Sequence, residues 1–479
     1  MAVVGGGMAG ILSAIRLREA GIDDVVVYEK ADRLGGTWRE NTYPGVACDV
    51  PSHLYSYSFA PNPEWRSAFS GGPEILRYLE DVAGRFGVDR HVQLGTEVRR
   101  LVWEGGRWSM ETSAGAQPPA DVVIAATGVL HHPAYPDLEG LERFAGPCFH
   151  TARWNHDLGL DGARIGIVGT GSSAVQVVGA LAARAGAVHL FQRTAQWVLP
   201  VPNPPVDDAE RQRLRADPSQ IAAIRSGWSK LFEENFANAV VDAHSPQLQA
   251  LDSTCRSHLE RSVRDDGLRE KLRPDYQAGC KRLVISPNFY EAVQQPNVHL
   301  VTDRIAAVEP DGVRTVDGAL HELDVLVLAT GFRVDRFLRP MDVVGRGGLR
   351  LDDVWARRPS AYLSISVPGF PNLFMLNGPN GPVGNFSLIE VAELQFDYIA
   401  QLLALLDGGG YREVSATAEA AARFEDERTE ATRSTVWSTG CRSWYLDDRG
   451  VPAVWPWTFD RFRREMAAPD LAHFELVPG

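Results

Sequence analysis

Two glycine-rich segments could bring the backbone close to a phosphate group. The first, residues 5–10 (GGGMAG), follows a short apolar run and precedes a helical pattern that stops at Gly21. A buried-strand pattern over 25–28 then ends in Glu29, nineteen residues after Gly10. This order predicts a dinucleotide-binding unit with Glu29 on the ribose, whereas a glycine turn alone would also suit an unrelated α/β fold. The residues expected at this nucleotide are Gly5, Gly7, Met8, Ala9, Gly10, Glu29 and Lys30.

The second segment, residues 169–174 (GTGSSA), repeats this plan with one difference. A strand pattern over 164–168 precedes it, and a helix and another strand pattern over 188–192 follow. The last strand ends in Arg193 instead of an acid, again nineteen residues after the turn. An arginine suits a ribose 2′-phosphate, so this unit predicts NADP(H), with a surface salt bridge as the alternative role of Arg193. The residues expected at this nucleotide are Gly169, Thr170, Gly171, Ser172, Ser173, Ala174, Gln176, Arg193 and Thr194.

The surrounding elements indicate a duplicated α/β architecture. Residues 121–128 (DVVIAATG) and 324–331 (DVLVLATG) are near copies, each a buried strand that ends in a small-residue turn. Between 206 and 276, charged helical patterns occur without strand patterns, which predicts a helical insertion. We expect the first small-residue turn to reach the first nucleotide through Ala126, Thr127 and Gly128.

The predicted fold class is therefore α/β, with two dinucleotide-binding, Rossmann-like domains and a helical insertion. Residues 1–140 and 334–479 are assigned to the first domain, 141–205 and 277–333 to the second, and 206–276 to the insertion. Local patterns also predict helices over 74–86 and 387–406, and a hairpin over 98–112 that turns at Gly105 and Gly106.

Composition limits the partners and the compartment. The 479 residues carry a net charge of −13, which argues against nucleic acid or anionic lipid as the principal partner. No apolar run comes near the ~18 residues that span a bilayer, and no basic segment precedes the first glycine turn, so neither a membrane span nor a signal peptide is expected. The five cysteines are widely spaced and form no CxxC pair, which predicts reduced thiols in a cytoplasmic protein.

Two further stretches combine aromatic, glycine and charged residues. One contains Gly36, Thr37 and Trp38 and ends at Asp49; such loops beside a nucleotide often carry function, although Asp49 could equally cap a turn. The other, residues 144–155 (FAGPCFHTARWN), lies between the two glycine-rich units. Its bulky aromatics are unusual for a tether, which leaves a buried joint and a functional hinge as alternatives.

These motifs resemble those of the type I flavin-dependent Baeyer–Villiger monooxygenases, and the resemblance covers essentially the whole chain. The family signature F-x-G-x-x-x-H-x-x-x-W is matched by Phe144, Gly146, His150 and Trp154, and Asn155 stands where Pro or Asp usually follows. A second signature is matched by Gly35, Gly36, Trp38, Tyr43, Pro44, Gly45 and Asp49. Two long signatures with two correctly placed dinucleotide segments are far more specific than any one of them.

The resemblance implies FAD in the first unit and NADPH in the second, with a ketone and O2 as the other reactants. In this family the reduced flavin forms a C4a-peroxyflavin that converts the ketone to an ester or lactone, beside an arginine–aspartate pair. The Lys-Arg step after the insertion makes Arg282 the candidate catalytic arginine, with Asp49 orienting it and Lys281 beside it, although adjacent basic residues alone are usually solvated. A nearby cation keeps the attacking oxygen anionic by lowering its pKa by about 1–3 units. Tyr55, Val98 and Trp444 match positions near flavin, adenine or bound NADP.

Three other functions are possible for this sequence. Asn155 keeps open a related monooxygenase that oxygenates an amine or sulfide. A dithiol oxidoreductase needs a redox cysteine pair, which the spacing does not offer, and a non-catalytic nucleotide-binding protein would be colourless. For the signature stretch, the position between two domains that must move favours a hinge, in which His150 holds the connection by hydrogen bonds.

Overall fold

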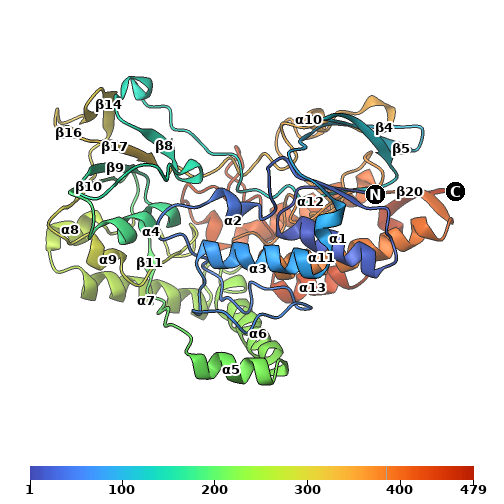
Figure 1. Ribbon diagram of the computed structural model, residues 1–479, viewed down its shortest axis with the longest axis horizontal. Helices are drawn as coiled ribbons and strands as arrows, with labels where there is room; N and C mark the ends of the chain where they lie inside the picture. Colours follow the sequence, from blue (N-terminus) through green and yellow to red (C-terminus); the bar gives the residue numbers. More distant parts are fainter. Residues whose placement is uncertain (385) are drawn as a thin grey trace.

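Two parallel sheets organise the chain, and the computed structural model describes residues 1–384 and 386–479. The first sheet has the order β19-β7-β1-β2-β3. Its strands are β1 (Ala2–Val4), β2 (Val26–Tyr28), β3 (Val92–Gln93), β7 (Val123–Ala125) and β19 (Leu373–Met375). Helix α1 (Met8–Glu19) connects β1 to β2 and packs against the long helix α11 (Leu388–Asp407), on the right of Figure 1.

The second sheet has the order β13-β10-β9-β17-β8 and lies on the left of Figure 1. Its strands are β8 (Cys148–His150), β9 (Arg164–Val168), β10 (Ala187–Phe191), β13 (Val298–Val301) and β17 (Val325–Leu328). Helix α4 (Ser172–Leu181) connects β9 to β10, and α9 (Phe289–Ala292) packs on α4. The predicted α/β fold with two dinucleotide-binding units is confirmed.

Smaller sheets and helices complete the two halves. The remaining strands are β4 (Val98–Glu104), β5 (Arg107–Thr112), β6 (Gly115–Ala120), β11 (Val198–Leu199), β12 (Val284–Ile285), β14 (Ile305–Glu309), β15 (Gly312–Thr315), β16 (Leu320–Glu322), β18 (Asp342–Val344), β20 (Tyr411–Ala416) and β21 (Phe474–Pro478). The remaining helices outside 208–271 are α2 (Thr37–Glu40), α3 (Gly72–Arg85), α10 (Leu351–Val354), α12 (Ala418–Ala431) and α13 (Phe459–Ala467). The predicted hairpin is confirmed: β4 and β5 pair antiparallel, and Gly105 and Gly106 turn with φ of 59° and 82°.

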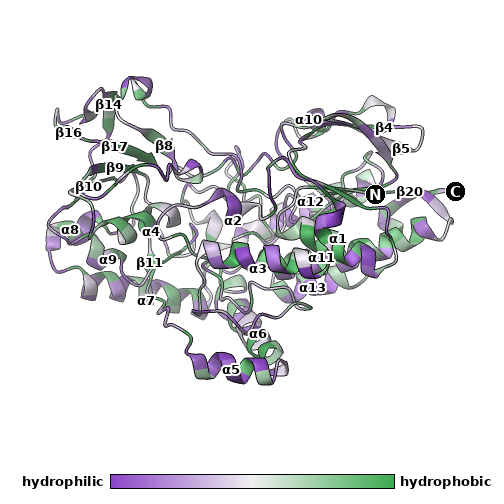
Figure 2. Ribbon diagram, viewed as in Figure 1, coloured by the Kyte–Doolittle hydropathy of each residue, from purple (hydrophilic) through white to green (hydrophobic). Residues whose placement is uncertain are grey.

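The region predicted as a helical insertion, residues 206–276, contains four α-helices and a π-helical segment, Glu233–Ala237. The α-helices are α5 (Asp208–Ala216), α6 (Ser219–Phe232), α7 (Pro246–Ser262) and α8 (Asp266–Lys271), and residues 208–271, all of which are described, contain no strand. Side chains of Asp207, Ser245 and Asp265 cap three of these helices, so their boundaries follow local sequence. Figure 2 shows that α5 is mostly hydrophilic, whereas strands such as β17 are hydrophobic. Throughout 1–384 and 386–479, every helix is too short or too polar to cross a bilayer.

The cysteines differ from the sequence prediction. Cys280 and Cys441 form a disulfide, with their Cα atoms 6.2 Å apart and a sequence separation of 161 residues. Cys48, Cys148 and Cys255 are free. The prediction of five reduced thiols is therefore wrong for two of them, because spacing along the chain does not reveal which distant cysteines the fold brings together.

Candidate functional site

The turn after β1 has room only for backbone. Gly5 has a φ of 106°, and a Cβ there would lie 2.5 Å from the Ala126 carbonyl oxygen at the end of β7. A Cβ on Gly10 would lie 1.8 Å from the Gly5 carbonyl oxygen, so α1 packs directly on the turn. Helix α1 has no side-chain cap and no acid in its first turn. A bare helix N-terminus behind a tight glycine turn fits the pyrophosphate of a dinucleotide.

The acid at the end of β2 is held in place for a ribose. Glu29 is buried and accepts hydrogen bonds from the backbone N–H of Gly6 at 2.6 Å and of Ala31 at 2.9 Å. Arg39 pairs with the same carboxylate at 3.2 Å. These contacts fix the carboxylate next to the glycine turn, and its ribose-binding role stays a prediction.

Gly10→Ala is expected to lower the free energy of unfolding of the apo protein by about 1–3 kcal/mol, because the new methyl group overpacks the turn. The widened turn should also reduce the flavin that stays bound through gel filtration. Thermal unfolding and flavin absorbance measure the two effects. As a control, Gly84→Ala in α3 places its Cβ no closer than 3.6 Å to a neighbour, so stability should hold or rise slightly. Equal losses in both variants would contradict the tight-turn interpretation.

The loop after β2 adds a second wall to this unit. Gly36 has a φ of 53°, and a Cβ there would lie 2.9 Å from the Cα of Gly7. Trp38 follows in α2, and its indole Nε1 donates to the Tyr55 hydroxyl at 3.1 Å. The structure thus brings together these predicted residues from separate motifs. Val98, in contrast, opens β4 and packs in a separate core with Tyr28.

The turn after β9 has the same construction as the first. Gly169 has a φ of 118°, and a Cβ there would lie 2.3 Å from the Ala329 carbonyl oxygen at the end of β17. Helix α4 likewise has no side-chain cap and no acid in its first turn. The Thr170 hydroxyl donates to the Thr194 carbonyl oxygen at 2.7 Å, which fixes the segment after β10. This unit also fits a dinucleotide pyrophosphate.

Two predicted nucleotide contacts on α4 form hydrogen bonds with the other domain. Ser173 donates to the Tyr43 hydroxyl at 3.0 Å, and the Tyr43 hydroxyl donates to Gln176 at 2.9 Å. Gln176 also donates to the Ala47 carbonyl oxygen at 3.1 Å. These bonds join α4 to the loop that follows α2. Burial raises the pKa of the Tyr43 hydroxyl to about 12, so it stays protonated as a donor.

Arg193 and Lys281 form a small cationic site beside the second unit. Arg193 is exposed at the end of β10, and Lys281 lies with its Nζ 4.7 Å from the centre of the Tyr276 ring. Burial lowers the pKa of Lys281, and the positive charge of Arg193 lowers it further. The negative charge of Asp275 raises the pKa of Lys281 and so offsets these two effects in part. Two cations that repel each other favour a dianionic phosphate between them.

Arg282 and Asp49 come together from 233 residues apart. Arg282 donates to Asp49 Oδ2 from Nε at 2.9 Å and from Nη2 at 2.6 Å, and Nη1 donates to the Gly384 carbonyl oxygen. Burial lowers the pKa of Arg282, but the Asp49 carboxylate and the Tyr445 hydroxyl more than offset this and raise it overall. The guanidinium is therefore held charged and oriented between the two dinucleotide units.

A cavity of about 50 Å³ opens at this pair. Apart from Asp49, Lys281 and Arg282, its wall is almost entirely apolar. The apolar residues come from the loop that carries Asp49, the insertion, the strand after it and the C-terminal region: Val50, Phe232, Phe236, Val240, Leu283, Ile285, Phe386, Trp437 and Tyr445. One charged pair in an apolar wall can stabilise charge that develops on an otherwise neutral ligand.

The signature stretch joins both halves. Its first part is β8, which pairs with β17 at the edge of the second sheet, and Gly146 lies where a Cβ would be 2.5 Å from the Asp324 carbonyl oxygen. Phe144 packs in the core of this half, and Trp154 packs edge-on against Phe149. Its last part reaches the first half through Arg153, which donates to Glu40 Oε2 at 2.6 Å.

His150 is fully buried in this stretch, and burial lowers its pKa, which favours the neutral ring. Its Nδ1 accepts from the Ala152 N–H at 3.1 Å. The ring packs between Tyr135 and Phe332, which lie on the two chain crossings between the halves, with 5.7 Å between ring centres in each case. This position suits a connection between domains; the hinge role stays a prediction.

Sequence reasoning missed two members of the site. Tyr445 is buried with its hydroxyl against Gly384, where a Cβ would lie 2.2 Å away, and it contacts Arg282. The predicted Trp444 next to it is largely exposed, at 40%. In the sequence, only its position next to Trp444 pointed to Tyr445. Gly384 lies in a loop, and residue spacing does not indicate that this loop contacts Arg282.

Comparisons with known proteins agree with this geometry. A family model described as pyridine nucleotide-disulphide oxidoreductase matches residues 2–225. A Baeyer–Villiger monooxygenase of Streptomyces coelicolor is 42% identical, over 100% of this chain and 92% of that protein, and one of Pseudomonas aeruginosa is 36% identical, over 100% and 91%. The crystal structure of cyclohexanone monooxygenase from Rhodococcus sp. Phi1 bound to NADP⁺ superposes with a TM-score of 0.89 at 31% identity, covering 100% of this chain and 99% of that one. The chain belongs to the type I flavin-dependent Baeyer–Villiger monooxygenases.

Proposed function

We propose that this protein is a monooxygenase that uses NADPH and O2 to convert a ketone to an ester or lactone, with FAD in the first dinucleotide unit. The observation that carries the proposal is the Arg282–Asp49 pair at an apolar cavity between the two units. FAD, when bound, takes hydride from the nicotinamide and activates O2. Residues of the first turn, Glu29 and Gly36 would hold FAD, and α4 with Arg193 would hold NADPH.

Arg282 supplies the positive charge that the reaction needs. Attack on a carbonyl requires an oxygen nucleophile that stays anionic, and a cation within about 4–6 Å lowers such a pKa by roughly 1–3 units. At about 1.4 kcal/mol per unit, this stabilises the nucleophile by roughly 1.4–4 kcal/mol. Asp49 orients the guanidinium through two of its nitrogens, so the charge is in place before substrate arrives. The same charge then stabilises the oxygen anion of the adduct.

The cavity wall indicates the substrate class. A neutral, apolar ketone would leave no buried polar group unpaired against Phe232, Phe386 and Trp437, whereas a charged amine would place a cation beside Arg282. The small free volume requires the wall to move for a ring-sized substrate. Because the wall combines the insertion with the C-terminal region, relative motion of these parts would open it.

A ketone panel with product identification tests the proposal. We expect NADPH consumption to rise with apolar cyclic or linear ketones and each consumed ketone to give an ester or lactone. A thioether is assayed in parallel, because sulfoxide without any ester would support oxygenation of sulfur or nitrogen instead. A preparation that neither binds flavin nor oxidises NADPH would contradict both activities.

A further inference from the structure

The Cys280–Cys441 disulfide lies next to the residues that carry the chemistry. Cys280 is two residues before Arg282, and Cys441 is four residues before Tyr445. Both cysteines are buried, in a cluster that also contains Trp437 and Tyr445. One covalent bond therefore joins the segment that carries Arg282 to the segment that carries Tyr445.

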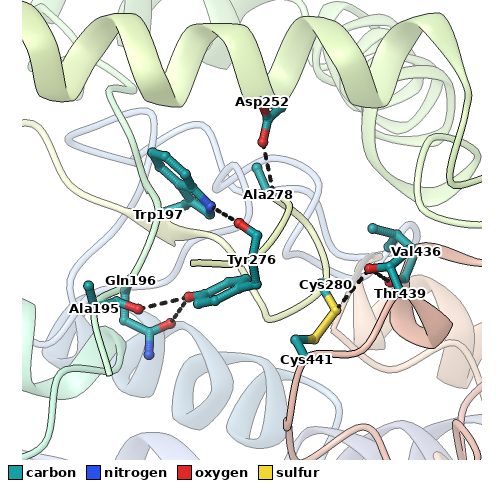
Figure 3. Close-up of a disulfide and its surroundings, with 10 residues drawn as sticks. All are labelled: Ala195, Gln196, Trp197, Asp252, Tyr276, Ala278, Cys280, Val436, Thr439 and Cys441. Atoms are coloured by element: carbon teal, nitrogen blue, oxygen red, sulfur yellow. Dashed lines mark hydrogen bonds between the residues drawn. A yellow bond between two sulfur atoms is a disulfide. The ribbon is translucent and has the colours of Figure 1, made fainter. Parts of the chain in front are cut away.

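The Cys280 side of this bond is firmly anchored, as Figure 3 shows. Tyr276 accepts from the Trp197 indole at 2.6 Å through its carbonyl oxygen, and its hydroxyl donates to the Ala195 carbonyl oxygen at 3.0 Å. Ala278 donates from its backbone N–H to Asp252 Oδ1 on α7 at 3.0 Å. Segment 276–282 is thus fixed to the second half and to the insertion.

The Cys441 side is anchored at both ends, where the Thr439 hydroxyl donates to the Val436 carbonyl oxygen at 2.8 Å and the Tyr445 carbonyl oxygen accepts from the Ala453 N–H at 2.7 Å. Ser438, Thr439 and Gly440 are exposed before Cys441, and Arg442 is exposed after it. Figure 3 shows that the Thr439 hydroxyl also lies 3.5 Å from the Cys280 sulfur, so Cys280 contacts this segment through a hydrogen bond as well as through the disulfide. The exposed residues between these anchors depend on the disulfide, so this part of the segment would open at low cost once the bond is broken.

Tyr445 is the residue that this tether places. Its hydroxyl contacts the Arg282 guanidinium and fills the space against Gly384, whose carbonyl oxygen accepts from the same guanidinium. Arg282 is thereby held on one side by Asp49 and on the other by Tyr445 and Gly384. Loss of the Tyr445 contact would leave the guanidinium held by Asp49 and the Gly384 carbonyl oxygen alone, which fixes its orientation less tightly.

We propose that the Cys280–Cys441 disulfide is a redox-sensitive positioning element, which holds Tyr445 against Arg282 and keeps the segment 438–445 closed over the cavity. Reduction by a dithiol breaks the S–S bond and forms two cysteine thiols, while the reductant loses two electrons and two protons and becomes a disulfide. The inference rests on the proposed function, because it describes how the position of the same arginine, Arg282, is regulated. The effect of the disulfide on the segment can nevertheless be measured without any ketone.

The first measurement establishes the bond and its effect on the segment. Oxidised protein should show three thiols when denatured and five after dithiothreitol treatment, since the chain has five cysteines and three are free. Tryptic cleavage of the native holoenzyme after the exposed Arg442 should accelerate about tenfold on reduction. The double variant Cys280→Ser/Cys441→Ser should cleave at the fast rate with or without dithiothreitol. Cys148→Ser, which removes an exposed free thiol, should behave like the parent.

The second measurement links the tether to Arg282. Ester formed per NADPH consumed should fall about tenfold on reduction, because the guanidinium is less well placed. Tyr445→Phe, which keeps the disulfide, should show the same loss of ester while its Arg442 site stays at the slow cleavage rate. Neither effect should respond to the Cys148→Ser change.

Several results would overturn the inference. Five thiols in protein that has been exposed to oxidised glutathione would mean that the bond does not form. An unchanged cleavage rate after reduction would show that the disulfide does not hold the segment closed. Faster cleavage with an unchanged ester yield would show that the disulfide does not affect Arg282. If no ketone is oxygenated at all, the proposed function fails, while thiol counts and cleavage rates still decide whether the tether exists.

Discussion

Arg282→Ala is expected to lower ester formation by about 10- to 1000-fold while leaving reduction of bound FAD by NADPH largely intact. The size follows from the loss of a cation that shifts the pKa of the oxygen nucleophile by one to three units. Reduction of the flavin needs no such charge, since hydride passes directly from the nicotinamide. Stopped-flow reduction without oxygen and product analysis with oxygen measure the two steps separately.

Two controls make this result specific. Arg282→Lys keeps a positive charge but loses the planar guanidinium group that donates to Asp49 and to the Gly384 carbonyl oxygen at the same time. We therefore expect an intermediate ester yield. Arg225→Ala removes another part-buried arginine, which pairs with Glu393 at 2.7 Å, and should cost stability without changing ester per NADPH. Ester formation at the parent rate in Arg282→Ala would show that Arg282 has no role in the oxygenation step.

The turns and strands of both dinucleotide units were predictable because they depend on local constraints. A positive φ and a backbone carbonyl within 2.5 Å exclude every side chain at Gly5, so the sequence must show glycine there. The hairpin between β4 and β5 is equally local, because alternating residues flank two glycines. Where residues close in the sequence determine the backbone geometry, the sequence pattern is sufficient to predict the element.

The contacts between distant segments were not predictable by the same means. Ser173 and Gln176 have the spacing of phosphate-binding residues, yet they bind Tyr43 and Ala47 across the domain boundary. The Cys280–Cys441 pair was missed for the same reason. The fold brings the two cysteines together, and no local periodicity in the sequence indicates such a long-range contact. Asp49 and Arg282 were found only because the family signature names their positions.

Arg193→Ala is expected to raise the KM for NADPH by about 10- to 100-fold and to leave the KM for NADH nearly unchanged, because a charge-assisted hydrogen bond to phosphate is worth about 1.5–3 kcal/mol. NADH lacks the 2′-phosphate, so it loses nothing at this position. Arg184→Ala is the matched control: this arginine lies in the same half, but its exposed guanidinium already pairs with Asp161 at 2.8 Å. Equal effects on NADPH and NADH would contradict the phosphate-binding role.

Lys281→Ala separates the two roles that its position allows. If Lys281 helps Arg193 to bind the 2′-phosphate, the variant should resemble Arg193→Ala, and saturating NADPH should restore kcat. If it acts in the chemistry beside Arg282, kcat and ester yield should stay low at any NADPH concentration. The structure favours the first result, because the charge of Arg193 already lowers the pKa of Lys281 and a bound dianion would relieve that repulsion. Asp275 offsets the repulsion on Lys281 only in part, so a bound dianion would stabilise both cations further.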